Sequence, residues 1–278
     1  MSDGFFDLPL SRRHTFSLLP VRKGSVHLSV LLWSLGPPRP CPISVCLKVL
    51  CIASASRKST LRALYSAPVL VTGEDQQDIL DKHNDLRRAV TPTTSNMLKM
   101  TWNNEAAENA QEWAKTCPME HSSYLFRKIS TTYCGENLFM SSHRLGWSQV
   151  IDSWYSEVKD WEYGVGSIND GVVGHFTQVV WYKSHELGCG LAYCPDSRFK
   201  YFYVCHYCPA GNYNLARPYK NGDSCADCPD NCDNGLCTKP CPYNDNFGNC
   251  PGFSYNCMFS FFVNWCPATY NCKSGEIV

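Results

Sequence analysis

The sequence contains no apolar run close to the roughly 20 residues that a membrane-spanning helix needs. Two short apolar runs, at residues 26–35 and 43–53, are the nearest approach. The part expected to fold also lacks a basic patch. The whole chain has 25 basic and 25 acidic residues, and residues 1–67 hold nine Lys and Arg against two Asp, so the excess of basic residues lies outside the expected domain. Nucleic acid is therefore not expected as a partner. No N-x-S/T sequon occurs, so no N-linked glycan is expected.

The 18 cysteines stand in three groups: Cys41, Cys46 and Cys51, then residues 117–208, then residues 225–272. Zinc-binding cysteines come as paired C-x2-C units separated by a loop, and the irregular spacing here does not follow that pattern. Disulfides fit better, and they persist only in oxidising compartments. We therefore expect a secreted, extracellular protein.

Residues 1–67 do not have the composition of a domain. The run at 43–53 ends in Ala53-Ser54-Ala55, which is similar to a signal-peptidase site. However, a signal peptide has its apolar core near the first methionine, and here the core starts late. Two interpretations stay open: an atypical leader and a disordered arm.

Residues 68–220 are long enough to bury one core. Helical spacing of apolar residues predicts helices over 74–90, with Thr72 or Asp75 as cap, over 102–115 and over 149–159. Alternation and aromatic content predict strands over 175–181, 188–193 and 200–205. This pattern favours an α+β sandwich. Beyond a turn-rich stretch at 218–223, nine cysteines fall in about fifty residues, so bridges must supply the stability of that region.

Several motifs resemble the CAP superfamily, and in particular the cysteine-rich secretory proteins of mammals. Residues 174–184 (GHFTQVVWYKS) and 202–213 (FYVCHYCPAGNY) resemble its two signatures. Residues 82–88 (KHNDLRR) and 134–138 (CGENL) are typical of it, and residues 225–237 are similar to the hinge of the secretory proteins. The resemblance implies a CAP-type α/β/α sandwich over 68–220, a disulfide hinge over 221–238, and a cysteine-rich, ShK-like helical module over 239–278. It also implies secretion, with storage in secretory granules.

The resemblance further implies a pairing of the cysteines. It would join Cys117 to Cys194, Cys134 to Cys208, Cys189 to Cys205, Cys225 to Cys232, Cys228 to Cys237, Cys241 to Cys272 and Cys250 to Cys266. The last module departs from the family, because Tyr270 stands where Cys257 should find its partner. Cys257 is then a candidate free thiol, and the module is expected to be incomplete by one bridge.

The family places His121, Glu136, Glu157 and His175 around one cleft. Two imidazoles and two carboxylates suit a divalent ion with an open position, Zn²⁺ being the default. They equally suit a general base with an electrophile, or a hydrogen-bond cluster that holds helices to the sheet. No nucleophile, and hence no catalytic residue, is assigned by the motifs, so we expect binding rather than catalysis. His83 and His206 are expected to be packing or surface residues.

The aromatic run at residues 258–265 has two interpretations. It supplies a core helix face with Phe262 and Trp265, or it forms an exposed interaction patch of Phe259, Phe261, Phe262 and Trp265. The functions that follow, in order of preference, are three. In the first, the protein docks on a membrane channel or a sperm or cell-surface protein through its C-terminal module. In the second, it carries a sterol or lipid against the CAP domain, where the tyrosines of 201–213 could line a pocket. In the third, it is a metal-dependent hydrolase that uses the His/Glu cleft.

Overall fold

The computed structural model describes residues 69–245, 247, 250 and 260–278. The expected leader, its cysteines at 41, 46 and 51, the candidate free thiol Cys257 and the patch residue Phe259 lie outside these described residues, as do the side chains of Phe261 and Phe262. The chain divides into two units, 1–59 and 60–278, and the second contains everything described below. Among the described residues, no helix combines the length and apolar character needed to cross a membrane.

Three helices form where the apolar spacing predicts them. Helix α1 spans Gly73–Arg88 and begins at a capping box, in which Thr72 Oγ1 accepts the Asp75 N–H and Asp75 Oδ2 accepts the Thr72 N–H. Helix α2 spans Asn104–Lys115, and helix α3 spans Trp147–Tyr155 before continuing as the 3₁₀ turn η1, Ser156–Asp160. Trp102 is not part of α2: it lies in strand β1, Thr101–Trp102, because Asn103 caps the helix by accepting the Ala106 N–H.

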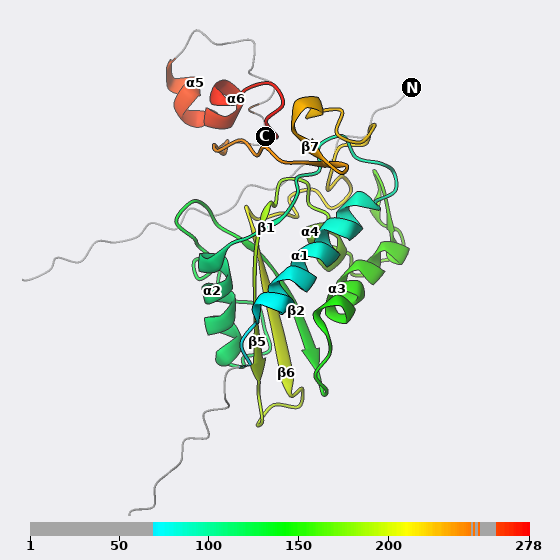
Figure 1. Ribbon diagram of the computed structural model, residues 1–278, viewed down its shortest axis with the longest axis vertical. Coiled ribbons are helices and arrows are strands. Elements are labelled where there is room, and N and C mark those ends of the chain that lie inside the picture. The colour runs from blue at the N-terminus through cyan, green and yellow to red at the C-terminus, as the bar shows by residue number, and fades with distance from the viewer. Residues whose placement is uncertain (1–68, 246, 248–249, 251–259) are drawn as a thin grey trace, which may run out of the picture. The chain divides into compact units, whose positions relative to one another are not determined.

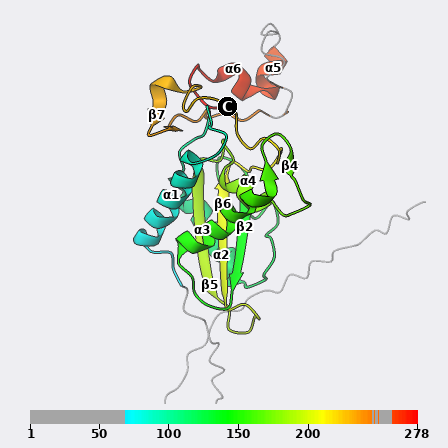
Figure 2. The same ribbon diagram turned by 90° about the vertical axis from the view of Figure 1, so that its right-hand side faces the viewer.

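The central sheet has the strand order β1-β5-β6-β2. Strands β2 (Gly135–Ser141), β6 (Tyr201–Cys208) and β5 (Glu186–Tyr193) pair antiparallel, and β1 pairs parallel to β5. Helix α2 covers one face of the sheet, and α1 and α3 cover the other (Figures 1 and 2). Along β6, Tyr203 packs in the cluster with α1 and α3, whereas Val204 packs in the cluster with α2. The domain is thus an α/β/α sandwich, as expected.

Two glycines let α2 lie close to the sheet. A Cβ atom at Gly188 of β5 would meet the backbone of α2 at Ala107, and one at Gly190 would meet the backbone at Gln111. The helix presents the fully buried Ala106, Ala110 and Ala114 to the same face. Small residues on both surfaces therefore set the spacing of these two layers.

The expected strand over 175–181 is wrong. Residues Gly174–Val179 form the short helix α4 instead. The cause is a carboxylate distant in sequence: Glu157 Oε2 accepts the backbone N–H of His175 at 2.9 Å and of Phe176 at 3.1 Å. These two donors have no partner within the helix, so an acceptor there stabilises its first turn. His175 consequently lies in the first turn of a helix and does not open a strand.

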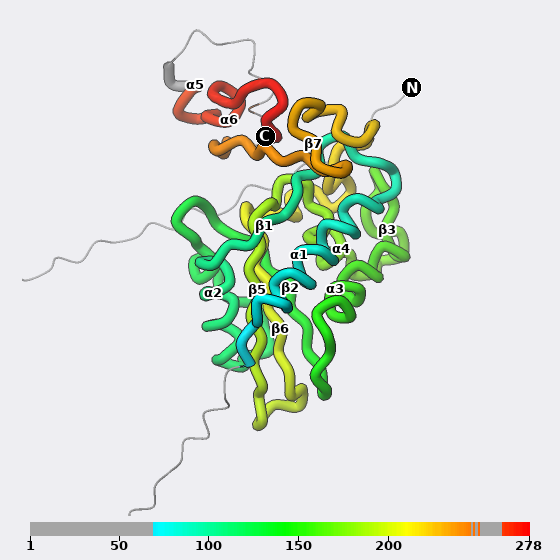
Figure 3. Tube along the Cα trace, viewed as in Figure 1, coloured from blue at the N-terminus to red at the C-terminus, as the bar shows by residue number. Residues whose placement is uncertain are grey.

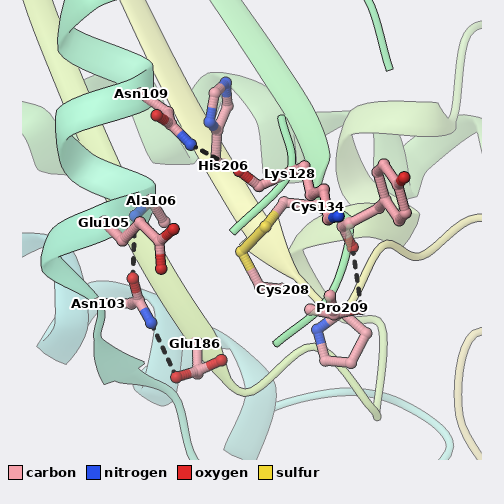
Figure 4. Close-up of a disulfide and its surroundings, with 12 residues drawn as sticks. Asn103, Glu105, Ala106, Asn109, Lys128, Cys134, Glu186, His206, Cys208 and Pro209 are labelled. Carbon is pink, nitrogen blue, oxygen red and sulfur yellow. Dashed lines mark hydrogen bonds between the residues drawn. A yellow bond between two sulfur atoms is a disulfide. The ribbon is translucent and has the colours of Figure 1, made fainter. Parts of the chain in front are cut away.

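Seven disulfides occur among the described residues, and they join the same pairs that the family resemblance implies: Cys117–Cys194, Cys134–Cys208, Cys189–Cys205, Cys225–Cys232, Cys228–Cys237, Cys241–Cys272 and Cys250–Cys266. The first three hold the sandwich. Figure 4 shows the bridge that ties the segment before β2 to the end of β6.

The remaining short elements connect and extend this domain. Strands β3 (Trp161–Glu162) and β4 (Gly166–Ser167) form a small hairpin. In the hinge, the 3₁₀ turn η2 (Pro229–Asn231) precedes strands β7 (Cys232–Asp233) and β8 (Leu236–Cys237), which pair antiparallel. Helices α5 (Ser260–Trp265) and α6 (Pro267–Asn271) follow in the last module.

The hinge lies next to the loop that follows α1 (Figure 3), and hydrogen bonds join the two. The Cys237 N–H donates to the Met97 carbonyl, and the Lys99 N–H donates to the Cys237 carbonyl. Leu98, between them, is fully buried against Cys225, Cys228, Cys237 and Ile277. The hinge bridges therefore pack as part of a small core that they share with the sandwich.

Candidate functional site

A cleft of about 490 Å³ opens at the edge of the sheet formed by β2. This volume lies within the range of small-molecule and peptide side-chain sites. Its lining comes from the segment before β2, from β2 itself, from the start of α4 and from the chain after β6: His121, Tyr124, Arg127, Cys134, Gly135, Glu136, Asn137, Val172, Gly174, His175, Gln178, Ala210, Gly211, Asn212 and Tyr213. Three of the four predicted site residues are in this set, and the fourth, Glu157, is bonded to His175.

The first histidine is held by a buried glutamate. His121 Nδ1 lies 2.7 Å from Glu136 Oε1, while 58% of the His121 side chain is exposed and none of the Glu136 side chain is. Glu136 also accepts the Ser122 N–H, the Ser122 hydroxyl and His206 Nε2. Burial by itself raises the pKa of Glu136, but the hydrogen bonds from His121, His206 and Ser122 outweigh it and hold the pKa well below its usual value. Glu136 is therefore an ionised carboxylate with its acceptor positions filled.

The second histidine has the same arrangement on a different element. His175 Nδ1, in the first turn of α4, lies 2.6 Å from Glu157 Oε1 in η1. The other oxygen of Glu157 accepts the backbone N–H groups of His175 and Phe176, so this carboxylate fixes the helix and the imidazole together. The His175 carbonyl in turn accepts the side-chain amide of Asn137.

The alternation of β2 explains how the two pairs meet in one cleft. Glu136 and Asn137 are adjacent in the strand, so their side chains point to opposite faces of the sheet. Because β2 is at the edge, Glu136 holds His121 on one side while Asn137 holds the α4 backbone on the other. The cleft wraps around this edge.

In both pairs the Nδ1 atom is bonded to a carboxylate, and Nε2 has no hydrogen-bond partner among the described residues. Metal-binding histidines usually have such a carboxylate behind them, which fixes the ring and raises its basicity. Both histidines line one cleft, and imidazole nitrogens with carboxylates behind them are donors that suit a divalent ion with open positions. The same geometry suits an imidazole acting as a general base. The hydroxyl group of Ser122, next to His121 in the sequence, donates a hydrogen bond to Glu136.

A metal ion could also be held by three or more His, Cys, Asp or Glu side chains whose ligand atoms all lie within 4.8 Å of one another. Within the described residues, one such set occurs: Cys225, Cys228 and Cys237. These sulfurs are already committed to disulfides with Cys232 and with each other. A disulfide sulfur is not the thiolate that binds zinc, so this cluster is a feature of the bridged hinge.

Sequence reasoning did not find His206, Ser122 and Arg127 as parts of this cluster. His206 was expected to be a packing or surface residue, and it is indeed fully buried, but its Nε2 lies 3.0 Å from Glu136 Oε2. Burial lowers its pKa, although the bond to Glu136 opposes the shift. The alternation of β6 could have placed His206 on a buried face; nothing in the sequence pairs it with Glu136.

His83 lies outside the cleft and packs in the core. Its ring nitrogens contact the Ile79 carbonyl at 2.8 Å and the Tyr207 hydroxyl at 2.9 Å. Tyr207 and Tyr203 are themselves fully buried, and the Tyr203 hydroxyl donates to the Leu145 carbonyl. The tyrosines in the middle of β6 are thus used in packing.

In the last module, Trp265 has 49% of its surface exposed and its ring lies 5.8 Å from that of Phe247, which is 52% exposed. For Trp265, this exposure does not fit the interpretation of the aromatic run as a core helix face.

Comparison with known proteins agrees with this architecture. The family model described as "Cysteine-rich secretory protein family" matches residues 80–207, and the model described as "Crisp" matches residues 225–277. Human Cysteine-rich secretory protein 3 is 49% identical over 217 residues, which cover 76% of this chain and 88% of that protein.

Solved structures are also similar to this chain. The crystal structure of NaASP2 with Zn²⁺ has a TM-score of 0.52 at 30% identity and covers 60% of this chain and 97% of its own. The structure of BmVAL-1 has a TM-score of 0.50 at 29% identity, over 60% of this chain and 95% of its own. With both family models matched in order and a relative that shares half its residues over most of both lengths, the chain belongs to the cysteine-rich secretory protein family.

Proposed function

We propose that the protein is a secreted binding protein that holds Zn²⁺ in its His121–His175 cleft and docks on a membrane channel or another cell-surface protein through its C-terminal module. The observation that carries the metal part is the pair of imidazoles whose Nδ1 atoms are each bonded to a carboxylate, at 2.7 and 2.6 Å. In this proposal Glu136 and Glu157 orient the rings, and the two Nε2 atoms bind the ion.

Secretion is supported by the seven disulfides, which require an oxidising compartment. The name of the human relative, Cysteine-rich secretory protein 3, agrees with secretion, and the crystal structure of NaASP2 with Zn²⁺ agrees with the metal. Storage in secretory granules stays a prediction. The docking role is supported by the exposed aromatic surface of Phe247 and Trp265 in a module held by two bridges.

Calorimetric titration of the chelator-treated, full-length protein with ZnCl₂ tests the metal site. We expect one site in the wild type and a loss of affinity of about tenfold or more in His121→Ala and in His175→Ala. The affinity should also fall at acid pH, because protons compete with zinc for the imidazoles. His143→Ala is the matched control, because His143 is exposed and lies outside the cleft lining. Unchanged zinc binding in both cleft variants would place the ion elsewhere and end the proposal.

The docking role is tested by flow cytometry with fluorescently labelled protein on intact mammalian sperm. Trp265→Ala should reduce saturable binding. Tyr193→Ala should not, since Tyr193 is a partly exposed aromatic of the sheet that contacts only Tyr201 among the ring pairs of the described residues. Equal binding of both variants would contradict docking through the C-terminal module.

A further inference from the structure

Arg127 lines the cleft and makes no hydrogen bond through its guanidinium to any described residue. Its Nε is buried without a partner, and its NH1 is 3.9 Å from Glu136 Oε1, which is too long for a hydrogen bond. Arg87, in the core, is the opposite case: its guanidinium donates to the carbonyls of Leu98, Val179, Trp181 and Tyr182. A guanidinium whose side chain is only 17% exposed normally spends its donors in this way, so the unused donors of Arg127 need an explanation.

Glu136 cannot take up these donors. Its two oxygens already accept four hydrogen bonds, from His121, His206 and both donors of Ser122. The backbone at Arg127 and at the residue after it is also fixed, because the Cys134 N–H donates to the Arg127 carbonyl. The side-chain amide of Asn109 donates to the Lys128 carbonyl (Figure 4). Arg127 is therefore a cation that lines the cleft from a fixed backbone position, and its guanidinium has hydrogen-bond donors without partners among the described residues.

The charges around the cleft select the kind of ligand. Without metal, the charged groups at the site are the Arg127 guanidinium and two carboxylates: Glu136, 3.9 Å from Arg127, and Glu157, which is bonded to His175. A bound Zn²⁺ adds two positive charges, so that three face two and one negative charge is needed for balance. A carboxylate meets this need and matches both partners, because it pairs with a guanidinium in a fork geometry and is also a zinc ligand.

The rim of the cleft indicates that the carboxylate belongs to a larger molecule. Tyr124, Val172 and Tyr213 line the cleft and are 50%, 66% and 76% exposed. The Tyr124 ring is stacked on Tyr133 at 4.5 Å, which makes it a fixed surface. An apolar and aromatic rim around a charged centre suits a peptide segment better than a free inorganic anion.

We propose that the cleft recognises a carboxylate group of a partner polypeptide, which binds between the Arg127 guanidinium and a zinc ion held by His121 and His175. This rests on the proposed zinc site and names the chemistry that the site recognises. Arg127 provides the selectivity for a carboxylate over its neutral amide, and Tyr124 and Tyr213 contact the rest of the chain. The carboxylate can come from an acidic side chain or from a chain terminus.

Three small probes separate these sources: acetyl-glutamate amide carries the side-chain carboxylate, acetyl-glutamine carries the terminal one, and acetyl-glutamine amide carries neither. Binding to the zinc-saturated, full-length protein is measured by ligand-observed NMR, which detects weak complexes. At least one acid should bind about tenfold more tightly than the neutral amide, as expected for a charge-assisted, forked hydrogen bond. The stronger acid identifies the source.

Arg127→Gln should remove this preference while zinc binding, titrated separately, persists. Arg127→Lys should retain part of it and also serves if Arg127→Gln does not fold. Arg144→Gln is the matched control, because Arg144 is exposed and outside the cleft lining. Zinc binding with no preference for either acid, or with a preference that survives in Arg127→Gln, would overturn this inference and leave the zinc site standing. Absence of zinc binding in the wild type would remove the proposed function and this inference with it.

Discussion

Glu136 of β2 lies directly opposite His206 of β6 in the antiparallel register, and the two side chains are joined by a 3.0 Å contact between Oε2 and Nε2. The register therefore places a buried acid beside a buried imidazole on the same face of the sheet. With the acid ionised, His206 donates through Nε2, and its Nδ1 is left without a partner among the described residues. The same carboxylate of Glu136 is bonded to His121 Nδ1, so the buried Glu136–His206 pair fixes the exposed ring of His121.

Ser122 supports the same carboxylate, and its removal should weaken the zinc site. Ser122→Ala deletes the 2.7 Å hydroxyl bond to Glu136 Oε2, so Glu136 should hold the His121 ring less firmly. We expect a loss of zinc affinity of about tenfold in a calorimetric titration, as is usual for the groups that support a metal ligand. Ser123→Ala is the neighbouring control, because among the described residues the Ser123 hydroxyl bonds only to the Phe126 N–H, as acceptor. Equal affinities in the two variants would show that this bond does not act on the histidine.

The close approach of α2 to β5 predicts a large effect of one added methyl group. In Gly190→Ala the new Cβ would meet the α2 backbone at Gln111, which cannot move aside as a side chain can. We expect the free energy of unfolding to fall by about 3 kcal/mol, measured by denaturant unfolding of the oxidised protein. Gly73→Ala is the control: a Cβ there has no atom within 4 Å, and alanine should leave stability unchanged or raise it slightly. A Gly190→Ala protein as stable as Gly73→Ala would contradict the packing described here.

His83 should make stability fall in mildly acid solution. Burial lowers its pKa to about 4, with the hydrogen bond to Ile79 opposing and Arg87 adding to the shift. Between the ordinary value of 6.5 and about 4, the unfolded chain binds a proton at this position and the folded chain does not. The neutral, buried His83 therefore makes its full contribution to the free energy of unfolding above pH 6.5. That free energy falls by on the order of 3 kcal/mol as the pH is lowered toward 4.

Urea unfolding at several pH values between about 4.5 and 7.5 measures this slope. His83→Gln should flatten it even though the variant is less stable at every pH. His143→Gln, at an exposed position, should keep the wild-type slope. A slope that is the same in all three proteins would show that His83 is not its source.

The C-terminal module should be sensitive to the residue at position 270. Cys257 has no inherited partner, and an unpaired cysteine in an oxidising compartment tends to link molecules. We expect disulfide-linked dimers in non-reducing gels, and Cys257→Ser should remove them. Tyr270→Cys should instead restore a bridge, stabilise the module by about 2–5 kcal/mol and slow its proteolysis. Tyr270→Ser controls for loss of the ring. Dimers that persist in Cys257→Ser would identify another cysteine as the reactive one.

The helices and the middle strands of the sandwich could be predicted from local sequence. Helix α1 has its capping residues, Thr72 and Asp75, next to an apolar period that buries Ile79 and His83, and both signals lie within the helix and its cap. Strands β5 and β6 are rich in the aromatic and aliphatic residues that a covered sheet needs. The family resemblance added the cysteine pairs, which spacing alone leaves open.

Only the tertiary structure decided the rest of the site. The alternation of residues 175–181 is that of a strand, and it became α4 because Glu157, 18 residues before His175, accepts the first N–H groups of the helix. Likewise Glu136 meets His206 through a strand register that spans 70 residues, and Arg127 is left with unused donors because other groups fill Glu136. Local sequence determined which segments are regular, because periodicity and capping act within a few residues. Which polar groups satisfy one another was decided by pairing between distant segments, and that pairing exists only in the folded chain.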